Sequence, residues 1–275
     1  MHGNNIIVSI VTVTYNAENT IRPTLNSILN QNYKYIEVIV KDAESNDKTN
    51  SIISDYGEEF SSRGYGFKHI VGKDTGIYNA MNIAAKSCEG DYILYLNAGD
   101  MLQDENTISD VLSMSIADCD ILYGDTIFKF GSHRFLWKGN LAVIKDKCPF
   151  CHQSMLIRKE WQLENDYDEG LEISADYDFI YKSYVLGAKF LYVNKIISVY
   201  IGGGKSGQEL VLDRKEHRIV QIRYNKREER TLRRRVNYGK RLLSAYIQEF
   251  IFENCESDFL YKLRLINKRR TMKEL

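Results

Sequence analysis

The chain has 275 residues, of which 44% are apolar and 27% are charged. This composition is that of an ordinary globular protein, and with only two prolines it excludes a fibrous or disordered chain. Basic and acidic residues number 37 each, so the net charge of the whole chain says little about its binding partners.

The first hundred residues alternate between strand-like and helix-like runs. Residues 6–14 are β-branched and almost continuously apolar, which predicts a strand buried on both faces. A helix over residues 19–31 follows, with Pro23 placed in its first turn. Further strands are predicted at 36–40, 67–71 and 92–96, and further helices at 47–56 and 77–87. This alternation predicts βαβ units, and hence an α/β fold with a mainly parallel sheet flanked by helices.

Beyond Asp100 the pattern is looser. It predicts a helix over 108–116, a strand or hairpin arm over 121–130, a short strand over 154–157, a helix over 175–186 and a strand pair within 190–200. From Gln208 onward the chain is predicted to be helical. Residues 205–275 hold 19 lysines and arginines against 10 aspartates and glutamates, whereas the rest of the chain is acidic by the same margin. The sequence therefore predicts an acidic globular body with a basic C-terminal helical extension.

Polar or aromatic residues follow each of the first four predicted strands. In an open parallel sheet, ligands bind at the carboxyl ends of the strands, where the strand order reverses. No glycine-rich phosphate loop is present, because Val199 stands where the first glycine of the Gly204-Lys205-Ser206 segment would be needed. Carboxylates at these positions favour a divalent cation such as Mg²⁺ or Mn²⁺ together with diphosphate oxygens. For any single aspartate, a helix cap or a turn is the simpler interpretation.

Several motifs in order resemble family 2 glycosyltransferases of the GT-A fold. They are SIVTVTYNAENTIRPTLNSILNQNY, EVIVKDAESNDKT, GKDTGIYNAMNIAAKSCEGDYILYLNAGD, CHQSMLIRKE and ISADYDFIYK. The resemblance implies a Rossmann-like glycosyltransferase domain over residues 1–205, with a nucleotide-sugar-binding half at 1–104 and an acceptor-binding half at 105–205. Residues 206–275 form the basic helical arm.

The resemblance also implies roles for individual residues. Tyr15 would pack on the nucleotide base, with Val13 beside it, and Asp42 would accept a hydrogen bond from the base. Asp74 would line the nucleoside pocket. The remaining residues implied at the site are Asn97, the metal-binding Asp100, the pocket residues His152 and Gln153, and the catalytic base Asp176.

Two departures from the family pattern affect the metal and the base. Asn97 and Gly99 stand where the family has further acids, so affinity for Mg²⁺ or Mn²⁺ would depend on Asp100, the diphosphate and water. Ala175 stands where many members have glutamate. Asp178 could substitute in part, although on a helix it would face another direction.

The resemblance implies an inverting transferase that moves a sugar from a nucleotide-diphosphate donor, most often a UDP-sugar, to a hydroxyl group of a glycan or lipid-linked acceptor, in surface polysaccharide synthesis. The alternative is a non-catalytic nucleotide-sugar-binding protein of the same fold. Residues 202–206 are predicted to be either a loop closing over the site or an irregular exit from the domain.

The basic arm has three interpretations: a helical hairpin packed on the domain, an amphipathic contact with an anionic membrane, and a nucleic-acid contact, which the acidic body disfavours. The N-terminus lacks a basic region followed by a long apolar run, and no segment has the roughly 20 apolar residues that span a bilayer. We therefore expect a cytoplasmic protein, peripheral on the inner face of the membrane if the arm binds lipid.

Overall fold

The computed structural model describes residues 5–114, 118–201, 209–225, 232–254 and 272–275. The N-terminal part contains three βα repeats and a fourth strand. These elements are β1 (Val8–Thr14), α1 (Ile21–Leu29), β2 (Ile36–Asp42), α2 (Thr49–Ser62), β3 (Gly66–Val71), α3 (Ile77–Ala85) and β4 (Tyr92–Tyr95). All the strands and helices predicted here are confirmed, with ends that differ by a few residues.

The second part is less regular, with strands and helices of very different lengths. Its elements are β5 (Met101–Leu102), α4 (Thr107–Leu112), β6 (Ile121–Phe130), β7 (His133–Trp137), the 3₁₀ turns η1 (Leu141–Val143) and η2 (His152–Ser154), β8 (Met155–Arg158), α5 (Lys159–Glu164), α6 (Ala175–Leu186) and β9 (Phe190–Ile201). After these come α8 (Leu210–Tyr224), α10 (Leu232–Asn254) and β10 (Lys273–Glu274). The expected strand pair within 190–200 is wrong: the segment is one strand, with a register shift against β6 and a left-handed Asn194.

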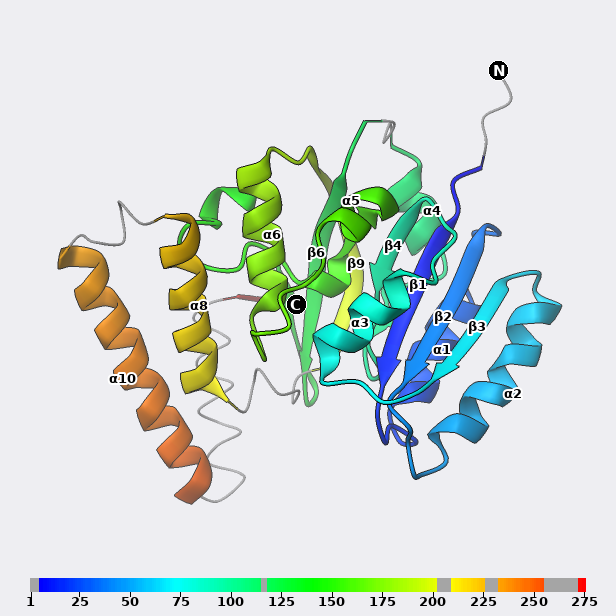
Figure 1. The fold of residues 1–275 in the computed structure, drawn as a ribbon, viewed down its shortest axis with the longest axis horizontal. Helices are drawn as coiled ribbons and strands as arrows, with labels where there is room; N and C mark the ends of the chain where they lie inside the picture. Colours follow the sequence, from blue (N-terminus) through cyan, green and yellow to red (C-terminus); the bar gives the residue numbers. More distant parts are fainter. Residues whose placement is uncertain (1–4, 115–117, 202–208, 226–231, 255–271) are drawn as a thin grey trace.

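One sheet runs through the domain in the order β10-β7-β6-β8-β4-β1-β2-β3, with β9 paired to β5 and β6 (Figure 1). Strands β4, β1, β2 and β3 are parallel to one another, as predicted. The sheet is mixed beyond β4, because β8 is antiparallel to both β4 and β6. The chain leaves β1 toward β2 and β3 and then returns to the other side of β1 as β4. In open α/β sheets, ligands bind outside the carboxyl ends of the strands at such a reversal. We call this position, at the ends of β1 and β4, the crevice.

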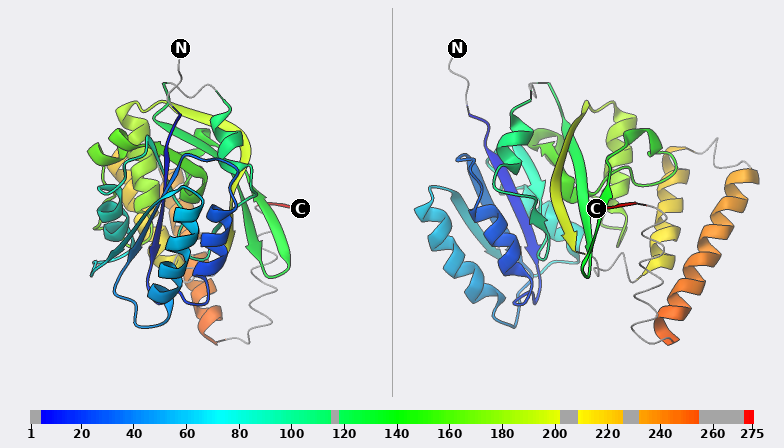
Figure 2. Two further views of the ribbon diagram at one scale, coloured as in Figure 1. Left: turned by 90° about the vertical axis from the view of Figure 1, so that its right-hand side faces the viewer. Right: turned by 180° about the vertical axis from the view of Figure 1, so that it is seen from behind.

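Two apolar cores lie on opposite faces of the sheet. Successive strand residues point to opposite faces, so Val8 and Ile10 of β1 enter the core beneath α1, α2 and α4, whereas Val11 and Val13 enter the core beneath α3 and α6. Figure 2 shows these helices on the two sides of the sheet. Burial on both faces explains the nearly continuous apolar runs of β1 and β2.

The helices α8 and α10 extend the domain beyond α6 (Figure 1). Val220 of α8 belongs to the core that includes Tyr177 and Tyr181 of α6, and α10 packs in turn on α8. The predicted helical character of this region is confirmed over the described residues, but β10, which pairs with β7, was not predicted. Residues 202–208, including the predicted loop over Gly202–Ser206, lie outside the described residues.

Candidate active site

The ends of β1 and β2 form the first wall of the crevice. Tyr15 follows β1 with 59% of its surface exposed, so its ring is accessible to a flat ligand. Asn16 adopts a left-handed conformation (φ 48°) and its N–H donates to Ser45 Oγ at 2.8 Å, which ties the two strand ends together. Val13 is buried, so its side chain packs in the core and only its backbone can contact a ligand.

Asp42 lies beneath that wall and is fully buried. Its carboxylate accepts hydrogen bonds from the Ser45 N–H at 2.7 Å, from Ser45 Oγ at 2.5 Å and from Asn50 Nδ2 at 3.2 Å. These bonds shape the turn after β2 and leave little acceptor capacity free. Asp42 therefore holds the turn against which a base would rest, and its direct bond to a base stays a prediction.

A buried ion pair joins β2 to the loop after β3. Lys41 is 1% exposed, and its Nζ lies 3.0 Å from Asp74 Oδ2 and also donates to the carbonyl oxygen of Gly72. The other oxygen of Asp74 accepts the Gly76 N–H at the start of α3. Two donors therefore fix Asp74 at the sheet edge, where the sequence placed it.

The turn after β4 carries the metal-motif residues. Gly99 has a φ of 106°, which a side chain would strain, so the turn can bring Asp100 inward. Asp100 is 5% exposed and accepts from Gln153 Nε2 at 2.7 Å and from the Ile201 N–H at 3.2 Å. Burial raises the pKa of Asp100 to about 6, against the lowering effect of these hydrogen bonds.

His152 connects this turn to the predicted base. Its Nε2 lies 3.2 Å from Asn97 Nδ2, and its Nδ1 lies 3.3 Å from Asp176 Oδ2. Asp176 is in the first turn of α6, where its Oδ1 also accepts the N–H of Tyr177 and its side chain is 22% exposed. The structure thus brings together three residues predicted separately, from β4, η2 and α6.

Asp178 does not belong to this group. It is buried, its Oδ1 accepts from Arg223 Nη1 at 2.7 Å and its Oδ2 accepts from Tyr224 at 3.3 Å, both on α8. The expectation that Asp178 faces away from the base position is confirmed. The idea that it substitutes in part for the missing glutamate is wrong, because this ion pair holds it against α8.

Glu216 of α8 fixes the approach to α6. Its two carboxylate oxygens accept three successive backbone N–H groups, those of Glu172, Ile173 and Ser174, at 2.8–2.9 Å. Glu216 is 4% exposed. Because Ser174 immediately precedes α6, this contact sets the position of the helix that carries Asp176.

Two buried polar atoms at the crevice have no hydrogen-bond partner within the described part of the chain: Thr14 Oγ1 at the end of β1 and Asn97 Oδ1 after β4. Buried polar atoms are normally paired, so unpaired atoms on neighbouring strand ends favour a ligand at this position. Across the described ranges, no cluster of three or more His, Cys, Asp or Glu side chains forms a metal cage. Asp100 and Asn97 instead fit a cation that takes most of its oxygen ligands from a diphosphate and water.

Comparison with known proteins identifies the family. A family model described as Glycosyl transferase family 2 matches residues 9–173, which is more than half of the chain. The chain belongs to this family. A PGL/p-HBAD biosynthesis glycosyltransferase of Mycobacterium bovis is 29% identical over 178 residues, which cover 62% of this chain and 67% of that protein. Hyaluronan synthase of Pasteurella multocida is 28% identical over 236 residues, which cover 80% of this chain and 23% of the synthase.

Solved structures confirm the GT-A fold. The mannosyltransferase PcManGT from Pyrobaculum calidifontis, in complex with GDP-Man and Mn²⁺, superposes with a TM-score of 0.67 at 14% identity, covering 98% of this chain and 81% of that one. TarS from S. aureus, in complex with UDP-GlcNAc, gives a TM-score of 0.63 at 17% identity over 90% of this chain and 73% of TarS. The chain is therefore a family 2 glycosyltransferase whose structural neighbours bind nucleotide sugars.

Lys41 and Glu216 were not singled out from the sequence. Lys41 could have been, because it directly follows the apolar run of residues 36–40, and a lysine buried in a strand needs a partner for its charge. Glu216 lies in a helix rich in charged residues, where nothing distinguishes it from solvent-exposed neighbours.

Proposed function

We propose that this protein transfers a sugar, with inversion at the anomeric carbon, from a UDP-sugar to a hydroxyl group of a glycan or lipid-linked acceptor, in surface polysaccharide synthesis. The observation that carries the proposal is the contact between Asp176 and His152, beside the crevice at β1 and β4. A partly exposed carboxylate close to these strand ends supports Asp176 as the group that accepts the proton.

In the proposed reaction, the acceptor oxygen forms a bond to the anomeric carbon while the bond from that carbon to the diphosphate breaks. Asp176 takes the proton of the acceptor hydroxyl, and the leaving diphosphate takes the bonding electron pair. Proton removal by a positioned base typically contributes 10²–10⁴-fold in rate. His152 can donate from Nδ1 to one carboxylate oxygen of Asp176 and so orient the carboxylate for the acceptor.

At the donor end, Tyr15 stacks on the base, and Val13 and Asp42 support the surface on which the base lies. Asp74 faces the nucleoside. Mg²⁺ or Mn²⁺, held by Asp100 with Asn97 Oδ1 nearby, would supply charge neutralisation at the diphosphate when bound. The elevated pKa of Asp100 means that a cation at this position competes with a proton in mildly acidic solution.

The direct test is the stereochemistry of the product. A nucleotide-sugar screen with Mn²⁺ identifies the donor by thermal shift, and about 100-fold excess over its dissociation constant should add about 2.7 kcal/mol of stability. NMR of the glycoside formed then reports its anomeric configuration. A product of opposite configuration to the donor supports the proposal, and a product of the same configuration overturns the inverting mechanism.

A non-catalytic nucleotide-sugar-binding protein is the alternative function, motivated by Asn97 and Gly99, which stand where the family has further acids. Donor hydrolysis and transfer, scanned across divalent cations, separate the two. Tight donor binding without turnover in any cation would establish the alternative.

The arm supports a second element of the proposal, contact with an anionic membrane. Val236, Leu243 and Ile247 lie along one side of α10 and are 48–62% exposed, and basic residues flank them in the sequence. Within the described residues, no helix is long and apolar enough to cross a membrane. Leu243→Ser with Ile247→Ser should weaken binding to anionic vesicles, and unchanged binding would reject this contact.

A further inference from the structure

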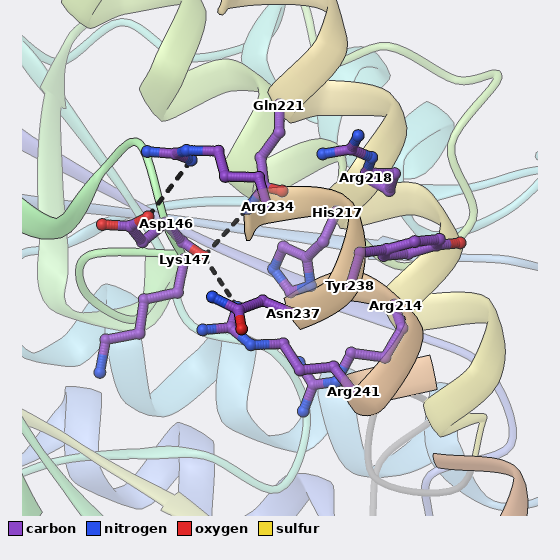
Figure 3. Close-up of a pocket in the computed structure, with 10 residues that line it drawn as sticks. All are labelled: Asp146, Lys147, Arg214, His217, Arg218, Gln221, Arg234, Asn237, Tyr238 and Arg241. Atoms are coloured by element: carbon purple, nitrogen blue, oxygen red, sulfur yellow. Dashed lines mark hydrogen bonds and ion pairs between the residues drawn. The ribbon is translucent and has the colours of Figure 1, made fainter. Parts of the chain in front are cut away.

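A cavity of about 70 Å³ lies between α8 and α10, away from the strand ends. Its walls come from α8, α10 and the segment after η1, and Figure 3 shows the side chains that line it. Its charged side chains are five basic residues and one acid, Asp146. The basic residues are Lys147, Arg214, Arg218, Arg234 and Arg241. We refer to it as the basic pocket.

The walls of the basic pocket are held by hydrogen bonds to two successive backbone carbonyls. Gln221 of α8 and Arg241 of α10 both donate to the carbonyl oxygen of Asp146, at 2.9 and 3.2 Å. Arg234 donates to the carbonyl oxygen of Lys145 and forms an ion pair with the Asp146 carboxylate at 3.3 Å. The two helices are thus joined to the same turn, so the cationic groups are brought together in a defined arrangement.

Protein carboxylates near the pocket balance only part of this positive charge. Arg234 is paired with Asp146, and Arg214 is paired with Asp213 at 3.2 Å. Arg241 binds a neutral carbonyl, and the Arg218 guanidinium lies 5.3 Å from the Tyr238 ring centroid. Two of the five lining cations, Arg241 and Lys147, therefore have no carboxylate partner within the part of the chain that the structure describes. Clustered like charges repel, so a bound anion would stabilise this arrangement.

Guanidinium groups from two helices suit one class of anion in particular. Their planar N–H pairs match the oxygens of phosphate and carboxylate groups, and several of them together favour the multiply charged phosphate. The cavity holds several water-sized positions, which is room for a single phosphate group.

The pocket also contacts the helix that carries Asp176. His217, which lines the pocket, packs its ring against Tyr177 of α6 with 4.8 Å between ring centroids. The neighbouring Glu216 fixes the start of α6. Anion binding at the basic pocket would therefore stabilise the packing of α8 behind the predicted base.

We propose that the basic pocket binds one phosphate group, either free or as the end group of a larger compound, at a site separate from the donor crevice. The group could come from a free phosphate compound or from the headgroup of a membrane lipid. Both sources present the same oxygens to the same arginines, so the experiment includes one arm for each. The proposal does not depend on transferase activity, because its readout is binding.

The test compares two double variants with equal loss of charge. Arg214→Gln with Arg241→Gln removes two lining arginines, and the control, Lys215→Gln with Lys240→Gln, removes exposed cations next to them that do not line the cavity. Inorganic pyrophosphate is titrated by calorimetry. We expect at least tenfold weaker pyrophosphate binding in the arginine variant and a change of less than about twofold in the lysine variant.

The second arm uses vesicles containing phosphatidate, compared with phosphatidylserine vesicles of equal surface charge. Loss of phosphatidate binding confined to the arginine variant supports a headgroup as the source, and loss of pyrophosphate binding alone supports a free phosphate compound. UDP titration should give parental affinity in both variants, which shows that the donor crevice is intact. Lys147→Gln, in the exposed turn, serves if the arginine variant is unfolded. Equal losses in the arginine and lysine variants, or no binding of either probe by the parent, would overturn the proposal.

Discussion

His152 Nδ1 lies 3.3 Å from Asp176 Oδ2, while Nε2 of the same ring lies 3.2 Å from Asn97 Nδ2. One imidazole therefore joins the turn after β4 to the first turn of α6. His152→Ala should leave Asp176 in place but remove the donor that orients its carboxylate. We expect kcat for sugar transfer to fall by about tenfold, which is less than the ~10²–10⁴-fold of a general base itself because His152 only orients that base. Donor affinity should change little. Steady-state kinetics with calorimetry of donor binding measures both.

The matched control is His133→Ala, a histidine in β7 that contacts Glu274 rather than the crevice. It should keep parental kinetics. If His152→Ala also keeps parental kcat, the imidazole has no part in orienting the base.

The nucleotide end is tested by two substitutions with different expected costs. Tyr15→Ala removes an exposed ring and should weaken nucleotide binding by about 0.5–1.5 kcal/mol without loss of stability. Asp42→Ala removes a buried acceptor of three hydrogen bonds, so it should lower both the thermal midpoint and nucleotide affinity. Nucleotide titration and thermal unfolding separate the effects, and parental affinity in both variants would misplace the base-binding wall.

Much of the fold could be predicted because the pattern of buried residues follows strand and helix periods. The run over residues 6–14 is apolar on both faces of β1 because this strand lies between the two cores. The single strand β9 could not be predicted, because its bulge near Asn194 interrupts the period-two pattern. The strand β10 has only two residues and exists through pairing with β7, a contact that local sequence does not encode.

The site was predicted in parts. Asp74, Asp100 and His152 lie beside predicted strands and Asp176 lies at the start of a predicted helix, while their roles follow from the family resemblance. The pairing of Asp100 with Gln153, and of Asp178 with Arg223, depends on tertiary packing between segments 45–53 residues apart. Periodicity carries no information on such contacts, so the sequence left Asp178 open as a partial substitute.

The raised pKa of Asp100 predicts a pH effect on stability in the metal-free protein. Burial lifts the folded pKa from 3.8 to about 6, so between these values the folded protein holds a proton that the unfolded chain has released. Stability from this group should therefore fall as pH rises from about 4 to 6, by on the order of 2–3 kcal/mol, and then stay level. Denaturant unfolding in EDTA measures it, and Asp100→Asn should flatten this part of the profile. Equal profiles for parent and variant would contradict the assignment.

The contacts of Glu216 predict that α8 contributes to the stability of the domain that carries Asp176. Glu216→Ala would leave three backbone N–H groups without this acceptor, two of them buried, which should cost about 3 kcal/mol. Lys215→Ala, at the exposed adjacent position, should cost little. Chemical denaturation gives both values. A loss below about 0.5 kcal/mol in Glu216→Ala would show that solvent replaces the carboxylate and that α6 does not depend on it.

The central claim is that Asp176 is the general base, and one pair of measurements on Asp176→Asn tests it most directly. Asparagine keeps the shape of the side chain and caps a helix start well, but it cannot take the acceptor proton. With the donor and acceptor found by screening, the rate of transfer should fall by about 10²-fold or more. Donor affinity, measured by calorimetry on the same preparation, should stay within about twofold of the parent. Transfer at near the parental rate would contradict the account.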